Sequence, residues 1–304
     1  MILYSGRLAR AILQPTCRGR FFNSHSRVKS ILSEGMEGSA NRPKNIAHRG
    51  ASSIAPENTL AAFREAIRLG ADGFELDAQL AKDDQVVVIH DGSLLRTTRS
   101  IGRVASKTLK ELHELDAGAW FNLRHPRYAS PDFIGERIPT LSEVMELIRD
   151  RPLCLYIEMK FARDSRPGIE EKIAQLINDF SLHDRAVVIS FNHQAIKTVK
   201  RLDRRIRTGA LFQRTLKYPV ISRSRLLMLA EAAEADELAL DKTLVTRPLL
   251  KAVRAAGYDI AVWTVNNPLM MRRMIKLGVS AIMTNYPQRL RSLQDRLNRA
   301  TQDW

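Results

Sequence analysis

Two charged pairs in this chain have the spacing that places both side chains on one face of a β-strand. Glu75 and Asp77 lie two residues apart, and Glu158 and Lys160 repeat the spacing after a later apolar run. In extended backbone such residues point the same way, roughly 7 Å apart along the chain. Three carboxylates that converge would repel one another, at a cost on the order of several kcal/mol for each desolvated charge. A hard divalent cation, Mg²⁺ or Ca²⁺, would offset that cost through oxygen ligands at ~2.0–2.6 Å.

The same acids can also form a salt-bridge network with Lys160 and Arg49 that holds no metal. Taken singly, each short motif favours that simpler interpretation. His48 and His90 also follow apolar runs, and their presence beside the acids favours a metal-assisted site instead.

Two histidines near such a site can transfer protons in both directions, because imidazole is half protonated near neutral pH. Arg49, next to His48, can hold a phosphate through two parallel hydrogen bonds, and Lys160 can add a point charge. Gly50 lets the backbone approach a ligand closely. The combination suits metal-assisted attack on a phosphodiester.

These residues must be positioned by an alternation of strands and helices that begins after Pro43. Short β-branched runs alternate with amphipathic stretches, which is typical of a sheet with crossover helices. The length suits a single barrel domain. We expect an α/β fold, a TIM-like (β/α)8 barrel, with one of nine strands as an accessory. The predicted strands are 45–47, 73–80, 85–90, 153–159, 186–190, 207–212, 237–240, 259–264 and 281–284.

Helix boundaries are marked by capping residues and prolines. The first helix is expected to begin at Asn58 or Thr59 and to stop at Gly70. Thr140 and Glu143 have the spacing of a capping box. Three further helices are expected to open at prolines: 167–180, 248–257 and 268–278.

One connection is too short for a parallel crossover, because only residues 78–84 separate Asp77 from the next strand. A hairpin turning at Asp83 and Asp84 is expected to place His90 opposite Asp77. The chain then makes an insertion after the third strand, at about 92–138, with one helix near 106–115. We expect this insertion to cover the site and shape its pocket.

The chain is identified from these segments as similar to the glycerophosphodiester phosphodiesterases, a family of phosphodiesterase barrels like phosphatidylinositol phospholipase C. The similarity runs from about Ile46 to Pro287. Its segments are His48-Arg49-Gly50, Pro56-Glu57-Asn58-Thr59, Glu75-Leu76-Asp77, His90-Asp91, Leu95-Arg96-Thr97-Thr98, Ile138-Pro139-Thr140-Leu141, Glu158-Met159-Lys160, Trp263-Thr264-Val265-Asn266 and Thr284-Asn285-Tyr286-Pro287.

The resemblance implies hydrolysis of glycerophosphodiesters to an alcohol and sn-glycerol 3-phosphate, with one divalent cation. In such enzymes a glycerol hydroxyl is thought to attack phosphorus, and water then opens the cyclic phosphate. His48 is expected as the first acid and His90 as the first base. The metal ligands and the phosphate contacts implied are Glu75, Asp77 and Glu158, and Arg49 and Lys160.

Five more residues are expected around this site. Glu57 and Asn58 are expected near the metal, although Asn58 could simply cap a helix, and Asp91 accompanies His90. Phe191 and Trp263, at later strand ends, line the pocket or pack in the core.

Asn285 is a departure, because the family usually has Asp there. The substitution removes one negative charge from the barrel rim.

Two other functions remain open. A lysophospholipase D would use the same site to release the headgroup of a single-chain lipid. A catalytically silent anion-binding protein would use its positive surface instead, with binding that weakens steeply as salt rises.

The formal charge is +15, with a pI near 10.2. Part of it is a basic run, Lys197, Lys200, Arg201, Arg204, Arg205 and Arg207. We expect a solvated helix face there, or weak attraction to an anionic membrane. No nucleic-acid module is evident, so no specific nucleic-acid binding is expected.

Residues 1–42 are expected to be a basic, poorly ordered extension before a barrel at 43–304. Eight Lys and Arg against two Glu give residues 1–45 a net charge of +6. Two cysteines, Cys17 and Cys154, imply no disulfide framework and make zinc a poorer choice of metal. A cytoplasmic location is expected, or a mitochondrial matrix if the Arg-rich leader is a transit peptide; alternatively, translation begins at Met36.

Overall fold

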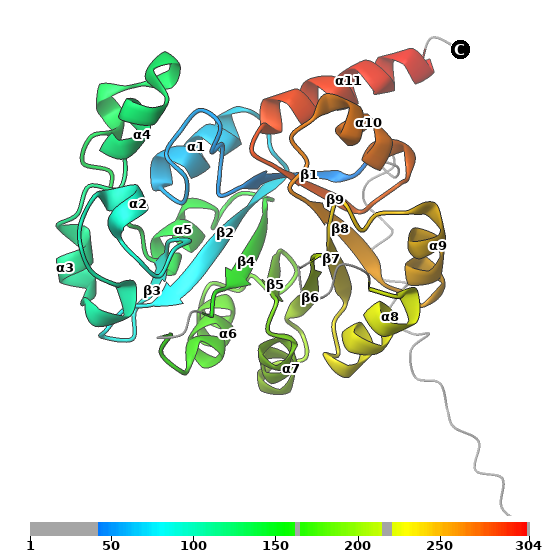
Figure 1. Ribbon diagram of the computed structural model, residues 1–304, viewed down its shortest axis with the longest axis horizontal. Coiled ribbons are helices and arrows are strands. Elements are labelled where there is room, and N and C mark those ends of the chain that lie inside the picture. The colour runs from blue at the N-terminus through cyan, green and yellow to red at the C-terminus, as the bar shows by residue number, and fades with distance from the viewer. Residues whose placement is uncertain (1–41, 162–164, 215–220, 303–304) are drawn as a thin grey trace, which may run out of the picture. The chain divides into compact units, whose positions relative to one another are not determined.

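The computed structural model describes residues 42–161, 165–214 and 221–302. Eight parallel strands close into a barrel because β1 pairs with β9 on one side and with β2 on the other. Figure 1 shows these strands in the middle, with helices around them. The strands are β1 (Lys44–His48), β2 (Gly73–Leu80), β4 (Cys154–Met159), β5 (Ala186–Ser190), β6 (Arg207–Phe212), β7 (Glu237–Asp241), β8 (Asp259–Trp263) and β9 (Ala281–Thr284).

One helix follows each barrel strand in sequence, which gives the (β/α)8 order expected. The accessory strand is β3 (Val86–Val88), which runs antiparallel to β2 outside the closed barrel. The helices of the barrel are α1 (Leu60–Arg68), α5 (Leu141–Leu147), α6 (Ile169–Asp179), α7 (His193–Leu202), α8 (Arg223–Ala232), α9 (Arg247–Ala255), α10 (Pro268–Lys276) and α11 (Pro287–Gln302).

The capping residues act largely as predicted. Thr59, rather than Asn58, caps α1 by accepting from the Ala62 N–H, and Thr140 and Glu143 form the capping box of α5. The helix expected to open at Pro167 begins two residues later, at Ile169, because Gly168 takes the N-cap position with φ 95°.

The β2–β3 hairpin has a register one residue away from the prediction. Ala78 pairs with Val88, and the Ile89 N–H donates to the Asp77 carbonyl, so His90 is not opposite Asp77. Asp84 has φ 59°, and the turn therefore contains three residues instead of two. The extra residue in the turn shifts every β2–β3 residue pair by one position relative to the prediction.

The insertion contains several short helices instead of the single one expected near 106–115. They are α2 (Leu95–Thr98), α3 (Leu109–His113), α4 (Ala119–Arg124) and three 3₁₀ turns, Val104–Ser106, Pro126–Tyr128 and Pro131–Phe133. A small apolar cluster that includes Leu94, Val104, Leu112 and Ile138 packs beneath them. In Figure 1 this group lies at one edge, beside α1 and β3.

The main core fills the space between the strands and the surrounding helices, and a second, smaller one fills the barrel. Inward-facing side chains alternate along each strand, so Ile46, Tyr156 and Ile189 pack inside. His48, Glu158 and Phe191 follow these residues two positions later. The same alternation therefore directs polar side chains to the C-terminal mouth of the barrel.

The prediction for residues 1–42 falls outside the described residues, apart from residue 42, and stays a prediction. Within the described part of the chain, no helix combines the length and apolarity that crossing a bilayer requires.

Replacing Gly73 with Ala tests how closely β2 and β4 approach. A Cβ at Gly73 would lie 2.1 Å from the Cys154 carbonyl oxygen, a backbone atom that cannot move independently. We expect Gly73→Ala to lower the free energy of unfolding by about 3 kcal/mol, the upper end for overpacking. Gly209→Ala is the matched control, because its Cβ meets the Ile189 methyl group at 2.9 Å, a side chain that can adjust. Equal urea midpoints for the two variants would contradict this account.

Candidate active site

Three carboxylates from two adjacent strands meet at the C-terminal mouth of the barrel. Asp77 on β2 pairs directly with Glu158 on β4, and Glu75 lies one inward position below Asp77. Oxygen atoms of the three lie within 4.8 Å of one another, as the sequence predicted. Their relative exposures are 1% for Glu75, 0% for Asp77 and 9% for Glu158. The barrel therefore concentrates negative charge where little water can screen it.

The pKa values of these acids diverge because their neighbours differ. Burial, with the charges of Asp77 and Glu158, raises the pKa of Glu75 well above its usual range. Burial would also raise the pKa of Asp77, but Arg49 and Lys160 lower it to about 2. Asp77 is therefore the carboxylate that stays ionised most readily.

Two cations offset part of the charge. Arg49 Nε lies 3.0 Å from Asp77 Oδ2, and Lys160 Nζ lies 2.8 Å from Glu158 Oε1 and 3.4 Å from Asp77 Oδ1. The salt-bridge network considered from the sequence is thus present, together with the acidic cluster rather than in place of it. Both cations also line the cavity, where they can reach a bound anion.

Asn58 and Glu57 hold this arrangement from the loop before α1. Asn58, with φ 58°, donates from Nδ2 to Asp77 Oδ2 at 2.8 Å, so it contacts the acidic cluster instead of capping the helix. Glu57 accepts from Arg49 Nη1 at 3.0 Å.

His48 is held through its Nδ1 atom. The Nδ1–H donates to Asn285 Oδ1 at 2.8 Å, and Nε2 lies 3.9 Å from Glu75 Oε2. Burial and the charge of Arg49 lower the pKa of His48 to about 4. The neutral Asn285 amide fixes the ring without adding the negative charge that Asp would bring.

His90 is held in the same way but by a charged partner. Its Nδ1–H donates to Asp91 Oδ1 at 2.6 Å, and Asp91 Oδ2 accepts from Arg96 Nε at 2.5 Å. Arg96 in turn donates two hydrogen bonds to Glu57. Burial lowers the pKa of His90. In both histidines Nε2 remains for proton transfer.

Arg96, six residues after His90, is a site residue that was not predicted from the sequence. The structure shows that it joins Asp91 to Glu57, and so connects the two loops that carry the histidines. No spacing rule indicates this contact, because Arg96 and Glu57 are 39 residues apart.

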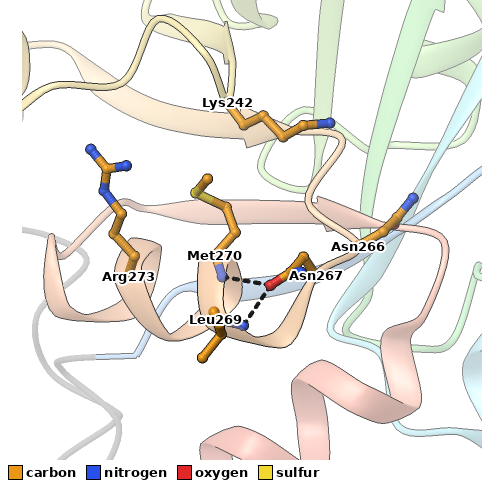
Figure 2. A pocket seen from close by; sticks show the side chains of 6 residues that line it. All are labelled: Lys242, Asn266, Asn267, Leu269, Met270 and Arg273. Carbon is orange, nitrogen blue, oxygen red and sulfur yellow. Dashed lines mark hydrogen bonds between the residues drawn. The ribbon is translucent and has the colours of Figure 1, made fainter.

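The backbone of Asn285, whose side chain anchors His48, is itself held by the β8–α10 loop. Asn266 Oδ1 accepts from the Asn285 N–H at 2.9 Å and from Thr284 Oγ1 at 3.2 Å. Asn266 also lines a separate pocket of about 470 Å³, where Asn267 caps α10 by accepting from Leu269 and Met270 (Figure 2). The fixed start of α10 thereby fixes the backbone of Asn285.

Glu75, Glu158, both cations and both histidines line one cavity of about 230 Å³, and Asp77 lies buried beside them. Phe191 and Trp263 meet edge to face on its wall, with ring centroids 5.6 Å apart, so of the two alternatives both side chains line the pocket. Lining residues that the sequence analysis did not single out are Ile189, Leu211, Gln213 and Met283. Each faces inward near the end of a strand, a pattern that the sequence does carry.

Fold and site together define a barrel enzyme in which carboxylates, cations and two anchored imidazoles gather at the C-terminal mouth. The model of the Glycerophosphoryl diester phosphodiesterase family matches residues 48–289, and the chain belongs to that family.

The sequences of named relatives align with this chain over most of its length. A glycerophosphodiester phosphodiesterase of Caldanaerobacter subterraneus is 41% identical over 82% of this chain and 96% of its own length. One from Bacillus subtilis is 33% identical, over 85% and 88%. A phosphodiesterase structure from Oleispira antarctica, in complex with the product sn-glycerol-3-phosphate, has a TM-score of 0.69 and 29% identity, over 84% of this chain and 97% of that chain.

Replacing Asn285 with Asp tests the anchor of His48. The new carboxylate would lie near Nδ1 and favour the imidazolium, so the pKa of His48 is expected to rise by about 1–3 units in metal-free protein. Nuclear magnetic resonance titration of the histidine ring protons measures it. His183, which already has Asp203 as its partner at 3.1 Å, is the internal control and should not move. An unchanged His48 pKa would show that the contact is absent in solution.

Proposed function

We propose that this protein hydrolyses glycerophosphodiesters to an alcohol and sn-glycerol 3-phosphate. The observation that carries the proposal is the convergence of a three-carboxylate cluster, two cations and two Nδ1-anchored histidines at one cavity. Membership of a phosphodiesterase family supports it, as does the product bound by the Oleispira relative.

The acidic cluster fits one divalent cation of the Mg²⁺ or Ca²⁺ type. Glu75, Asp77 and Glu158 supply oxygen atoms close enough to share an ion. Asp77 Oδ1 is buried and has no hydrogen-bond partner among the described residues. An ion bound there would polarise the phosphoryl oxygen and lower the pKa of a coordinated hydroxyl.

The protein's own residues then divide the remaining work. Arg49 and Lys160 hold the phosphate oxygens and offset charge that builds up on them. One histidine accepts the proton of the attacking glycerol hydroxyl through Nε2 while the other donates a proton to the leaving alcohol oxygen. The roles reverse when water opens the cyclic phosphate. The order expected from the resemblance, with His48 as first acid, stays a prediction.

A lysophospholipase D would use this same chemistry on a lipid with one acyl chain. Rates on glycerophosphocholine, glycerophosphoethanolamine and a lysolipid, measured with one preparation, separate the two substrate classes. Failure on all three would contradict the enzymatic proposal.

Metal binding should stabilise the protein and should depend on pH. Since the pKa of Glu75 is raised without metal, ligation must displace a proton, and affinity is expected to increase as pH rises through that pKa. Adding Mg²⁺ or Ca²⁺ should therefore raise the melting temperature more at pH 8 than at pH 5.5.

In the Glu75→Gln variant, the metal concentration needed to reach the same rise in melting temperature should be at least about tenfold higher. Glu237→Gln is the matched control, because Glu237 is also buried in the barrel but lies at the start of β7, at the opposite end. An equal loss in both variants would point to damage to the barrel instead of a lost ligand.

The histidines can be tested by truncation. His48→Ala and His90→Ala should each lower kcat on glycerophosphocholine at least ~10²-fold, because one proton transfer then lacks its donor or acceptor. His125→Ala, an exposed histidine of the insertion, should retain full activity. Full turnover by either first variant, with the fold verified by circular dichroism, would remove that histidine from the mechanism.

A further inference from the structure

The insertion carries a surface that combines exposed leucines with unpaired arginines, next to the active site. Ten large apolar side chains are classed as exposed in the described ranges, and five of them lie between residues 92 and 138. They are Leu95, Ile101, Leu123, Tyr128 and Ile134. A segment this short would not collect half of them by chance, so the exposure calls for an explanation.

Two of these leucines face one pocket. Leu95 on α2 is 60% exposed and Leu123 on α4 is 65% exposed, and both line a cavity of about 620 Å³ with Trp120. Neither belongs to the apolar cluster beneath the insertion. Figure 1 shows α2 and α4 close together, beside α1.

The charge of this pocket is positive. Arg99 and Arg124 line it and have no acidic partner among residues 42–161, 165–214 and 221–302. Arg96 also lines it but is taken by Glu57 and Asp91. Asp91, the one acid in the lining, is engaged by His90 and Arg96. We define the α2–α4 surface as Leu95, Arg99, Leu123 and Arg124.

The basic run on α7 is a weaker candidate for the same role. Lys197 lies 3.5 Å from Glu234, and Lys200 lies 2.7 Å from Asp236. Arg205 and Arg207 each lie 2.7 Å from an aspartate, Asp203 and Asp259. Most of that positive charge is therefore neutralised within the protein, and Lys200 is buried rather than part of a solvated face.

We infer that the α2–α4 surface docks the protein on an anionic lipid bilayer. Exposed leucines beside arginines match the boundary between headgroups and acyl chains, where the apolar side chains leave water and the guanidinium groups meet lipid phosphates. A neutral partner surface would not account for the arginines, and a soluble anion would not account for the exposed leucines.

Docking there would bring the catalytic mouth to the lipid. The pocket shares Asp91 with the active site, and Asp91 lies 2.6 Å from His90. Docking would give the active site access to substrates that leave the bilayer, and only this consequence rests on the proposed function. The docking itself does not depend on catalysis.

A pair of triple variants of the full chain tests the assignment. Leu123→Ser with Arg99→Gln and Arg124→Gln alters the α2–α4 surface. Leu202→Ser with Arg201→Gln and Arg204→Gln removes one exposed leucine and two exposed arginines at the end of α7, and is the matched control. Co-sedimentation with vesicles of phosphatidylglycerol and phosphatidylcholine measures partitioning, and both variants keep the same N-terminal residues.

We expect wild type and the α7 variant to bind, and the α2–α4 variant to bind roughly 30-fold more weakly, since each arginine near the surface contributes about fivefold. Binding should fall at high salt and on pure phosphatidylcholine vesicles. Equal binding by both variants, equal loss in both, or no binding by wild type would each overturn the inference.

Hydrolysis of glycerophosphocholine in solution separates this result from the proposed function. The α2–α4 variant should retain the wild-type rate, because none of its altered residues touches the acids or the histidines. Loss of vesicle binding with that rate intact supports docking, whereas loss of both shows that the variant damages the site and overturns the assignment. A wild type that binds vesicles but hydrolyses nothing would contradict only the proposed function.

Discussion

The central constraint on the site is that the fold must hold three buried carboxylates close together. The pairing of Asp77 with Glu158 across β2 and β4 fixes their separation, and Glu75 follows from the two-residue period of the strand. Bringing these charges together is unfavourable, and the strands can do it only because each carries a packed apolar core on its other face. Arg49 and Lys160 offset part of the repulsion, and a divalent cation would offset more.

The closed barrel makes this concentration of charge possible. Apolar side chains such as Ile46 and Leu211 fill its middle, so that the polar groups at the mouth rest on a dry layer. The other end has a polar set of its own, in which Tyr156 donates to the buried Glu237 and burial raises the pKa of that acid to about 7. The apolar layer of the barrel lies between the two charged sets and keeps them at opposite ends of the strands.

Both histidines are anchored by a hydrogen bond from Nδ1, but their partners differ. Each is anchored at Nδ1 and presents Nε2, and both hydrogen bonds favour the positive imidazole, but only Asp91 also brings a negative charge. Glu57 and Arg96 extend the anchor of His90 to the loop that holds Arg49, whereas Asn266 extends the anchor of His48 to β8. The site is thus held by segments that follow neighbouring strands, β8, β9 and β1, and by the segment after β3, which pairs with β2.

The sequence by itself determined the order of strands and helices, the capping box at Thr140, and the acids on one strand face, because these follow from local spacing and backbone preference; it left the first cap open between Asn58 and Thr59. It did not determine the hairpin register, which a left-handed Asp84 shifted by one residue, or the short helices of the insertion, which packing on a small core decides. Contacts such as His48 with Asn285, 237 residues apart, and Arg96 with Glu57 appear only when the barrel closes. Closure brings distant strand ends together, and no local pattern contains the distance between them.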